Sequence, residues 1–128
     1  MAPKTAAEFL DLAQWKSVLT AFAKERDWEK FHTPKNLASA LSVEASELLE
    51  LFQWLTAEES LQLALPNGDA ELRKNIEREM ADVLVYLMRL STVLKIDLSK
   101  ALNDKMAENA KKYPADKVKG QAKKYDQY

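Results

Sequence analysis

The sequence predicts an all-α fold in the form of a four-helix bundle, and three observations support this prediction. Hydrophobic residues make up 47% of the 128 positions, which is enough for one core. Apolar residues recur at three- and four-residue steps through most of the chain, the spacing of amphipathic helices. Only 2 Gly and 4 Pro are present, too few turn formers for a fold of many strands.

The first half of the chain is expected to form two long helices. Thr5 and Glu8 have the spacing of a capping box, which predicts the start of a first helix that ends near Arg26. A loop over 27–36 contains an interior proline, and the second helix is expected over 36–56.

The second half is expected to form two more long helices. A short helical turn at 57–65 precedes the breaker Pro66-Asn67-Gly68. Asp69 is a suitable cap for a third helix that reaches Lys95, and Asp97 for a fourth that ends near Tyr113. We therefore predict a helical domain over 1–114 and a polar, basic tail over 115–128.

The composition excludes several classes of protein. With no cysteine, the chain cannot form a disulfide scaffold, a Cys-ligated zinc site or a thiol nucleophile. Its only histidine, His32, excludes both a site with two imidazoles and the paired Glu-x-x-His units of di-iron bundles. A net charge of -1 gives no positive field for a nucleic acid polymer. No run of membrane-spanning length and no signal-peptide stretch is present, so we expect a soluble, cytoplasmic protein.

Two glutamates stand where leucine would be expected. In the second helix, positions 37, 41, 44, 48, 51 and 55 have the spacing of a buried seam, and all are leucine except Glu44. In the third helix, positions 72, 76, 79, 83, 86, 90 and 93 follow the same rule, and Glu79 is the only charged residue among them. Between Met80 and Leu94 this helix has few charges, so we expect it to be largely buried.

Each seam glutamate has an acidic neighbour one turn further on. Glu47 follows Glu44 by three residues, and Asp82 follows Glu79 by the same step, so each pair shares one helix face. Unpaired buried carboxylates cost several kcal/mol each, so four of them together must be protonated or must bind cations. A ligand set made only of carboxylate oxygens is one that Mg²⁺ prefers.

The same residues have simpler interpretations. Acidic pairs at this spacing are common on solvated helix faces, and Glu47 also forms one with Glu50. A buried network between the glutamates and arginine or lysine is the other alternative, with Arg78 and Arg89 as the available partners.

Five blocks of the sequence resemble one family. EASELLELFQW (44–54) and EMADVLVYLMRL (79–90) are similar to the ExxE and ExxD blocks of the all-α nucleotide pyrophosphohydrolases, the MazG-like superfamily. RDWEKFHTPKNL (26–37), IDL (96–98) and KMAENAKKYP (105–114) match the single-domain branch that includes dCTP pyrophosphatases. The resemblance spans about 22–114. Val43 departs from the Glu-Glu pair of many members, and the segment between the acidic blocks is longer than in many.

The resemblance implies an activity, a cofactor and an assembly. It implies Mg²⁺-dependent hydrolysis of a nucleoside triphosphate to monophosphate and pyrophosphate, a house-cleaning reaction of the dNTP pool. It also implies a homo-oligomer, a dimer or a dimer of dimers, that completes the bundle. Glu44, Glu47, Glu79 and Asp82 are the expected metal ligands and catalytic residues, and one glutamate could instead orient the attacking water.

Nucleotide-binding residues are expected in the other matching blocks. Lys105, Asn109 and Lys112 share one face of the fourth helix, and the resemblance implies that they hold phosphates. The resemblance also favours Trp28 and Trp54 as partners of the base, whose edge His32 or Asn36 could hydrogen-bond. Spacing alone is equally compatible with a solvated lysine face and with aromatic residues that pin a loop.

Three functions remain open on the sequence alone. The first is a dNTP pyrophosphatase that prefers dCTP or its modified forms. The second is the same enzyme acting on dUTP or a noncanonical purine triphosphate. The third is a non-enzymatic helical oligomerisation or interaction module whose acidic seams pair with basic residues.

Overall fold

The computed structural model describes residues 10–127, which form helices and turns without a β-strand in that range. The all-α class is therefore confirmed for the described part of the chain. The chain divides into two compact units, one up to Leu94 and the other from Lys95 onward.

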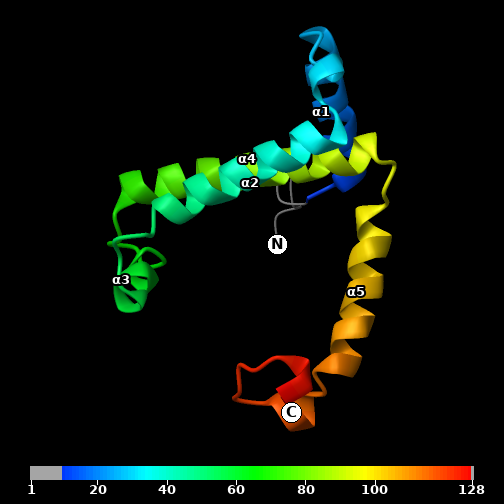
Figure 1. Cartoon of the computed structure of the whole chain (residues 1–128). Coiled ribbons are helices and arrows are strands. Elements are labelled where there is room, and N and C mark those ends of the chain that lie inside the picture. Colours follow the sequence, from blue (N-terminus) through cyan, green and yellow to red (C-terminus); the bar gives the residue numbers. More distant parts are fainter. Residues whose placement is uncertain (1–9, 128) are drawn as a thin grey trace, which may run out of the picture. The chain divides into compact units, whose positions relative to one another are not determined.

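The first unit is built on two long helices that lie side by side. Helix α2 (Pro34–Glu50) packs along α4 (Ala70–Val93), and α1 (Leu12–Glu25) packs against α4 (Figure 1). The pair is antiparallel, because His32, just before α2, contacts Arg89 in the last turns of α4. A single 3-10 turn, η2 (Glu29–Phe31), joins α1 to α2, and the short helix α3 (Ala57–Gln62) precedes α4.

Capping side chains account for most helix starts. Asp69 accepts a hydrogen bond from the Leu72 N–H, and Asp97 accepts one from the Lys100 N–H, so both predicted caps are confirmed. Thr33 and Thr56 cap α2 and α3, the latter through a complete capping box. The predicted box of Thr5 and Glu8 lies outside the described residues.

Two predicted helix boundaries are wrong. Helix α1 begins at Leu12, where the Asp11 carboxylate accepts from the Gln14 N–H. Helix α2 ends at Glu50 instead of continuing to residue 56, and 3-10-type hydrogen bonds such as Leu51 N–H to the Leu48 carbonyl close its last turn. The apolar spacing continues past this point, so periodicity alone could not locate the end of the helix.

Both predicted seams face inward in the structure. Leu37 is 1% exposed and Ile76 is 9% exposed, and every other seam position in both helices is at least partly buried. The two glutamates therefore lie on the apolar interface between α2 and α4, as their spacing predicted.

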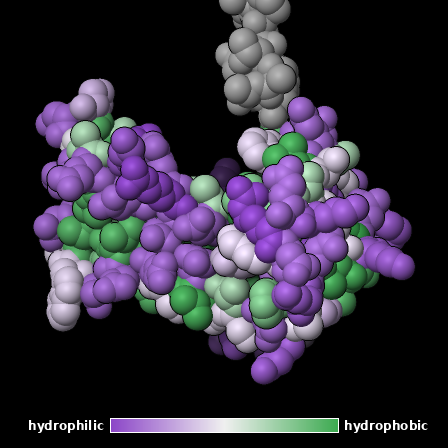
Figure 2. All heavy atoms as spheres, turned by 90° about the horizontal axis from the view of Figure 1, so that it is seen from above, coloured by the Kyte–Doolittle hydropathy of each residue, from purple (hydrophilic) through white to green (hydrophobic). Residues whose placement is uncertain are grey.

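The rest of α4 is less buried than expected. Residues 83–86 and 88–93 are at least partly buried, as expected, but Met80 is 56% exposed and Leu87 is 38% exposed. Figure 2 likewise shows apolar side chains at the surface between hydrophilic ones. The charge-poor sequence of α4 thus provides more apolar surface than its neighbours in one chain cover.

The second unit contains α5 (Leu98–Lys112), the short α6 (Ala115–Val118) and a 3-10 turn, η3 (Tyr125–Gln127). The segment after 114 thus contains two short helical turns, and its polar character is as predicted. Because α5 belongs to this second unit, the four-helix bundle and the domain boundary at 114 stay predictions. Among the described residues, no helix is long and apolar enough to cross a membrane.

Candidate active site

Three carboxylates from α2 and α4 form a compact group. Glu44, Glu79 and Asp82 each place one oxygen so that all three atoms lie within 4.8 Å of one another. The antiparallel pairing explains this geometry, because Glu44 on the α2 seam lies opposite Glu79 on the α4 seam. We call these three residues the carboxylate cluster. The structure thus brings together three of the four predicted metal ligands.

The cluster contains two polar atoms without a partner. One oxygen of Glu44 and one of Glu79 are fully buried, and neither has a hydrogen-bond partner among the described residues. Leaving a buried carboxylate oxygen without a partner is costly, and native structures contain few such atoms. Both seam glutamates therefore have an unmet requirement for a proton or a cation.

The electrostatics of the cluster reflect this crowding. Burial is the main cause that raises the pKa of Glu44 to about 7, and the nearby carboxylates of Glu47 and Asp82 raise it further. Burial and the Glu47 charge also raise the pKa of Glu79. Like charges at short range therefore favour protonation of these groups in the absence of a cation.

No lysine or arginine within residues 10–127 forms an ion pair with the cluster. Arg89 donates its hydrogen bonds to His32 and Thr20, and Arg78 forms no ion pair within residues 10–127. The alternative of a buried network between the glutamates and arginine is therefore wrong for this part of the chain.

Glu47 lies at the edge of the cluster. Its side chain is exposed, and its oxygens do not belong to the group of three. It is nevertheless close enough to raise the pKa of both Glu44 and Glu79. Of the predicted ligands on α2, Glu47 is therefore the one more accessible to solvent.

Two of the predicted base-binding residues lie together at the other end of the helix pair. The Trp28 and His32 rings are 6.4 Å apart, and the Phe22 ring meets Trp28 edge to face at 5.9 Å. These side chains line a small cavity of about 70 Å³ together with Leu19, Ala23, Val85, Tyr86 and Arg89. Phe31, in the turn between Trp28 and His32, is 59% exposed and is not among the residues that line this cavity.

Trp54 is not part of this cavity. It follows the end of α2, whereas Trp28 and His32 precede its start, and the helix between them is roughly 25 Å long at 1.5 Å per residue. Trp54 is also 87% exposed. Within one chain, the structure does not bring Trp54 together with the other two predicted base-binding residues.

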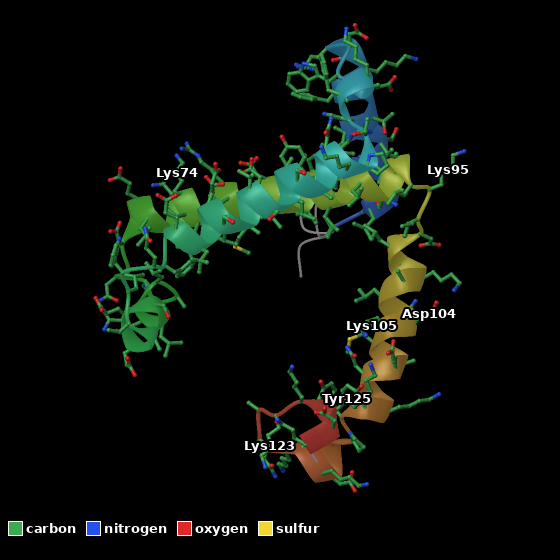
Figure 3. The ribbon with its side chains drawn as sticks, viewed as in Figure 1. Lys74, Lys95, Asp104, Lys105, Lys123 and Tyr125 are labelled. Atoms are coloured by element: carbon green, nitrogen blue, oxygen red, sulfur yellow. The ribbon has the colours of Figure 1, made fainter. Side chains whose placement is uncertain are left out.

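The predicted phosphate-binding residues lie on α5 in the second unit. The Lys112 ammonium is 2.8 Å from one Glu108 oxygen, and the Lys105 ammonium is 3.4 Å from the other, so both lysines approach a single glutamate. Asn109 lies between them in sequence and is half-buried. Figure 3 shows Lys105 on α5 and Tyr125 on the segment that follows α5. The Lys112 ammonium, at the end of α5, lies 4.7 Å from the centroid of the Tyr125 ring.

The comparison with known protein families identifies the chain. The model of the MazG-like family matches residues 39–127, which is more than half of the sequence. The chain belongs to the MazG-like family. Both carboxylate-bearing helices lie inside the match apart from the first turn of α2.

Solved and curated relatives agree with the family. A pyrophosphatase from Archaeoglobus fulgidus superimposes with a TM-score of 0.72 at 37% identity, covering 87% of this chain and 99% of that one. The dCTP pyrophosphatase 1 of Homo sapiens is 43% identical over 105 residues, and that of Rattus norvegicus is 45% identical over 105 residues. These alignments cover 81% of this chain, which spans 59% of the length of either relative.

One feature of this MazG-like chain was not predicted from its sequence. Arg89 is 5% exposed and connects α4 to Thr20 on α1 and to His32 before α2. We predicted it only as a possible partner of the glutamates. A signal was present, because a lone arginine in a charge-poor helix must find polar partners, but one sequence cannot say which.

Proposed function

We propose that this MazG-like chain hydrolyses deoxynucleoside triphosphates to monophosphate and pyrophosphate. The observation that carries the proposal is the carboxylate cluster, in which two buried oxygens lack a partner among the described residues. The names of the relatives, dCTP pyrophosphatase and pyrophosphatase, support the same reaction class.

The residues of the cluster fit a divalent cation. Mg²⁺ takes hard oxygen ligands, and the buried oxygens of Glu44 and Glu79 are such ligands without another partner in the described part of the chain. We propose Glu44, Glu79 and Asp82 as the ligands, with Glu47 as the fourth from the exposed rim. Bound Mg²⁺ would offset the charge of the triphosphate and make a nearby water more acidic.

The reaction replaces one phosphoanhydride bond. A water oxygen bonds to the α-phosphorus, the bond from this phosphorus to the bridging oxygen breaks, and pyrophosphate leaves with that oxygen. A carboxylate at the site takes the proton of the water, and Glu47 and Asp82 are the two exposed candidates that can pass it to solvent.

The base and the phosphates are assigned to separate parts of the chain. Trp28 and His32 would contact the base at the small cavity, and Lys105, Asn109 and Lys112 would hold phosphates on α5. The lysines must then leave Glu108 or share it with the ligand. Because α2 separates Trp54 from Trp28, a base contact by Trp54 in the same site would have to come from a second copy of the chain.

A homo-oligomer is part of the proposal. The first unit exposes apolar residues, among them Trp54, Leu61 and Met80. Apolar surface of this kind is what contacts between subunits cover. A dimer or a dimer of dimers in the cytoplasm is the assembly that we expect. Preference for dCTP is the substrate choice that the names of the curated relatives favour.

A product-resolved assay tests the proposed reaction. The full chain is incubated with each of the four common dNTPs and dUTP, once with Mg²⁺ and once with excess EDTA, and the products are separated. We expect dNMP and pyrophosphate with Mg²⁺ only, with dCTP consumed fastest. Formation of dNDP and phosphate would contradict the bond assignment. No turnover of any triphosphate by folded protein would favour the non-enzymatic interaction module.

A further inference from the structure

Arg89 is a buried cation without an acidic partner among the described residues. Its side chain is 5% exposed, and no carboxylate oxygen of residues 10–127 forms an ion pair with it. Its Nε–H lies 3.3 Å from Nδ1 of His32, and one terminal NH₂ lies 3.2 Å from the Thr20 hydroxyl oxygen. A charge buried without an opposite charge is expensive, so a role beyond packing is expected of it.

The contact with Arg89 determines which nitrogen of His32 can carry a proton. A guanidinium group has only donors, so the imidazole nitrogen that faces it must be the acceptor. A neutral imidazole has one N–H, which must then be on Nε2. Burial and the positive charge of Arg89 both lower the pKa of His32, and the smaller opposing effect of Glu29 does not reverse this.

His32 lies where a ligand could use that N–H. Its ring lines the cavity of about 70 Å³ beside Trp28 and Tyr86, and Nε2 has no hydrogen-bond partner within residues 10–127. Arg89 lines the same cavity from α4, and the Thr20 hydroxyl fixes the other end of its guanidinium. The hydrogen bonds that join Thr20, Arg89 and His32 thus leave the Nε2–H of His32 as a donor that faces an aromatic cavity.

We propose that Arg89 is a positioning residue that fixes His32 as an Nε2–H donor, so that the bound base must present an acceptor at this edge. The inference rests on the proposed function and deepens it by naming what sets the base preference. Cytosine has acceptors at both O2 and N3, whereas N3 of uracil and thymine carries a hydrogen. O2 is an acceptor in all three pyrimidines, so a donor-only His32 favours cytosine over uracil and thymine where its Nε2–H faces the N3 position.

Nuclear magnetic resonance tests the first half of this proposal on the protein alone. Because His32 is the only histidine, ¹⁵N-labelled histidine gives one pair of ring signals. We expect an unprotonated Nδ1 and a protonated Nε2 at pH 7.5 in EDTA-treated full-length protein. A proton on Nδ1, or a charged ring at that pH, would overturn the proposal without any variant and without any assay of activity.

Two variants of α4 test the second half. Arg89→Met should give a mixture of both His32 tautomers and raise the KM for dCTP about fivefold to tenfold, with a smaller change in kcat. The ratio of kcat/KM for dCTP to kcat/KM for dUTP should also fall in Arg89→Met. The control is Lys74→Met, which removes one positive charge from an exposed position of the same helix (Figure 3).

A further variant separates positioning from packing. Thr20→Val removes the other partner of Arg89 but keeps the contact with His32, so the Nε2–H tautomer should persist.

An unchanged His32 tautomer and an unchanged dCTP preference in folded Arg89→Met would overturn the role of Arg89. If Arg89→Met does not fold, the wild-type spectrum still decides the tautomer. Absence of turnover with every dNTP would overturn the proposed function, whereas the spectrum tests the tautomer independently.

Discussion

Glu44 on α2 and Glu79 on α4 face each other across an apolar helix interface, and each buries one carboxylate oxygen that has no partner among the described residues. A seam of leucines would pack here without any such cost. The two residues therefore lower the stability of the isolated helix pair, and a bound cation is the most direct way to offset that loss.

The first prediction concerns pH and metal together. The pKa of Glu44 is raised from 4.5 to about 7, so its proton stabilises the folded state most below pH 4.5, and this stabilisation is lost as the pH rises through 7. In EDTA, we expect the melting temperature to fall between pH 5 and pH 8. Mg²⁺ should raise the melting temperature more at pH 8 than at pH 5, because the carboxylates must lose their protons to bind it.

Thermal unfolding of the Glu44→Gln variant is the control for this prediction. An amide cannot titrate, so the variant should lose much of the dependence of melting temperature on pH and of the gain from Mg²⁺. If the wild-type melting temperature in EDTA were unchanged or rose from pH 5 to pH 8, the description of the cluster as a crowded, cation-requiring site would be wrong.

The second prediction concerns Trp28. The Trp28→Ala substitution should raise the KM for dCTP about tenfold and weaken discrimination between bases, because stacking on an aromatic ring is worth about 1–3 kcal/mol per base. The dependence of the rate on Mg²⁺ should remain, because Trp28 lines the cavity beside His32 and does not belong to the carboxylate cluster. Steady-state kinetics with dCTP and dTTP provide the measurement.

Trp15→Ala is the matched control, because Trp15 on α1 is 46% exposed and Trp28 is 43% exposed. It should leave the KM and the base preference as they are. Equal effects of both substitutions on KM would move the base site away from the cavity beside His32.

The third prediction concerns Gly68 in the turn before α4. A Cβ atom at this position would lie 2.6 Å from the Gln62 carbonyl oxygen and 3.1 Å from the Leu63 Cα, so backbone would have to move. Gly68→Ala should therefore destabilise the fold by about 1–3 kcal/mol. Denaturant unfolding should detect this loss, and Asn67→Ala at the exposed neighbouring position should have a much smaller effect. Equal stability of Gly68→Ala and the wild type would contradict the turn geometry.

The helices and the cluster were largely predictable from the sequence for a physical reason. A seam position is defined by spacing, so the leucines at 37 and 48 by themselves identify Glu44 as inward-facing. Asp69 and Asp97 were equally predictable, because a cap acts on an N–H only three residues away. Local chemistry thus specifies most helix starts and the faces that they bury.

The features that the sequence did not reveal depend on distant contacts. The end of α2 at Glu50 was missed because the leucine spacing runs on through Leu55. The Arg89 contacts with Thr20 and His32 join residues 69 and 57 positions apart, and no local pattern encodes that choice. The exposure of Met80 likewise depends on which surfaces pack together and not on the composition of α4.

The carboxylate cluster is expected to bind the metal that the proposed reaction needs, and a Mg²⁺ titration of the wild type and two variants can decide this. Pyrophosphate release from dCTP is followed as Mg²⁺ is added to the wild type, to Glu79→Gln and to Glu77→Gln, which alters an exposed carboxylate on the same helix. We expect Glu77→Gln to resemble the wild type and folded Glu79→Gln to lose about 100-fold or more of the rate. Near-full activity of Glu79→Gln, or release that continues in EDTA, would contradict it.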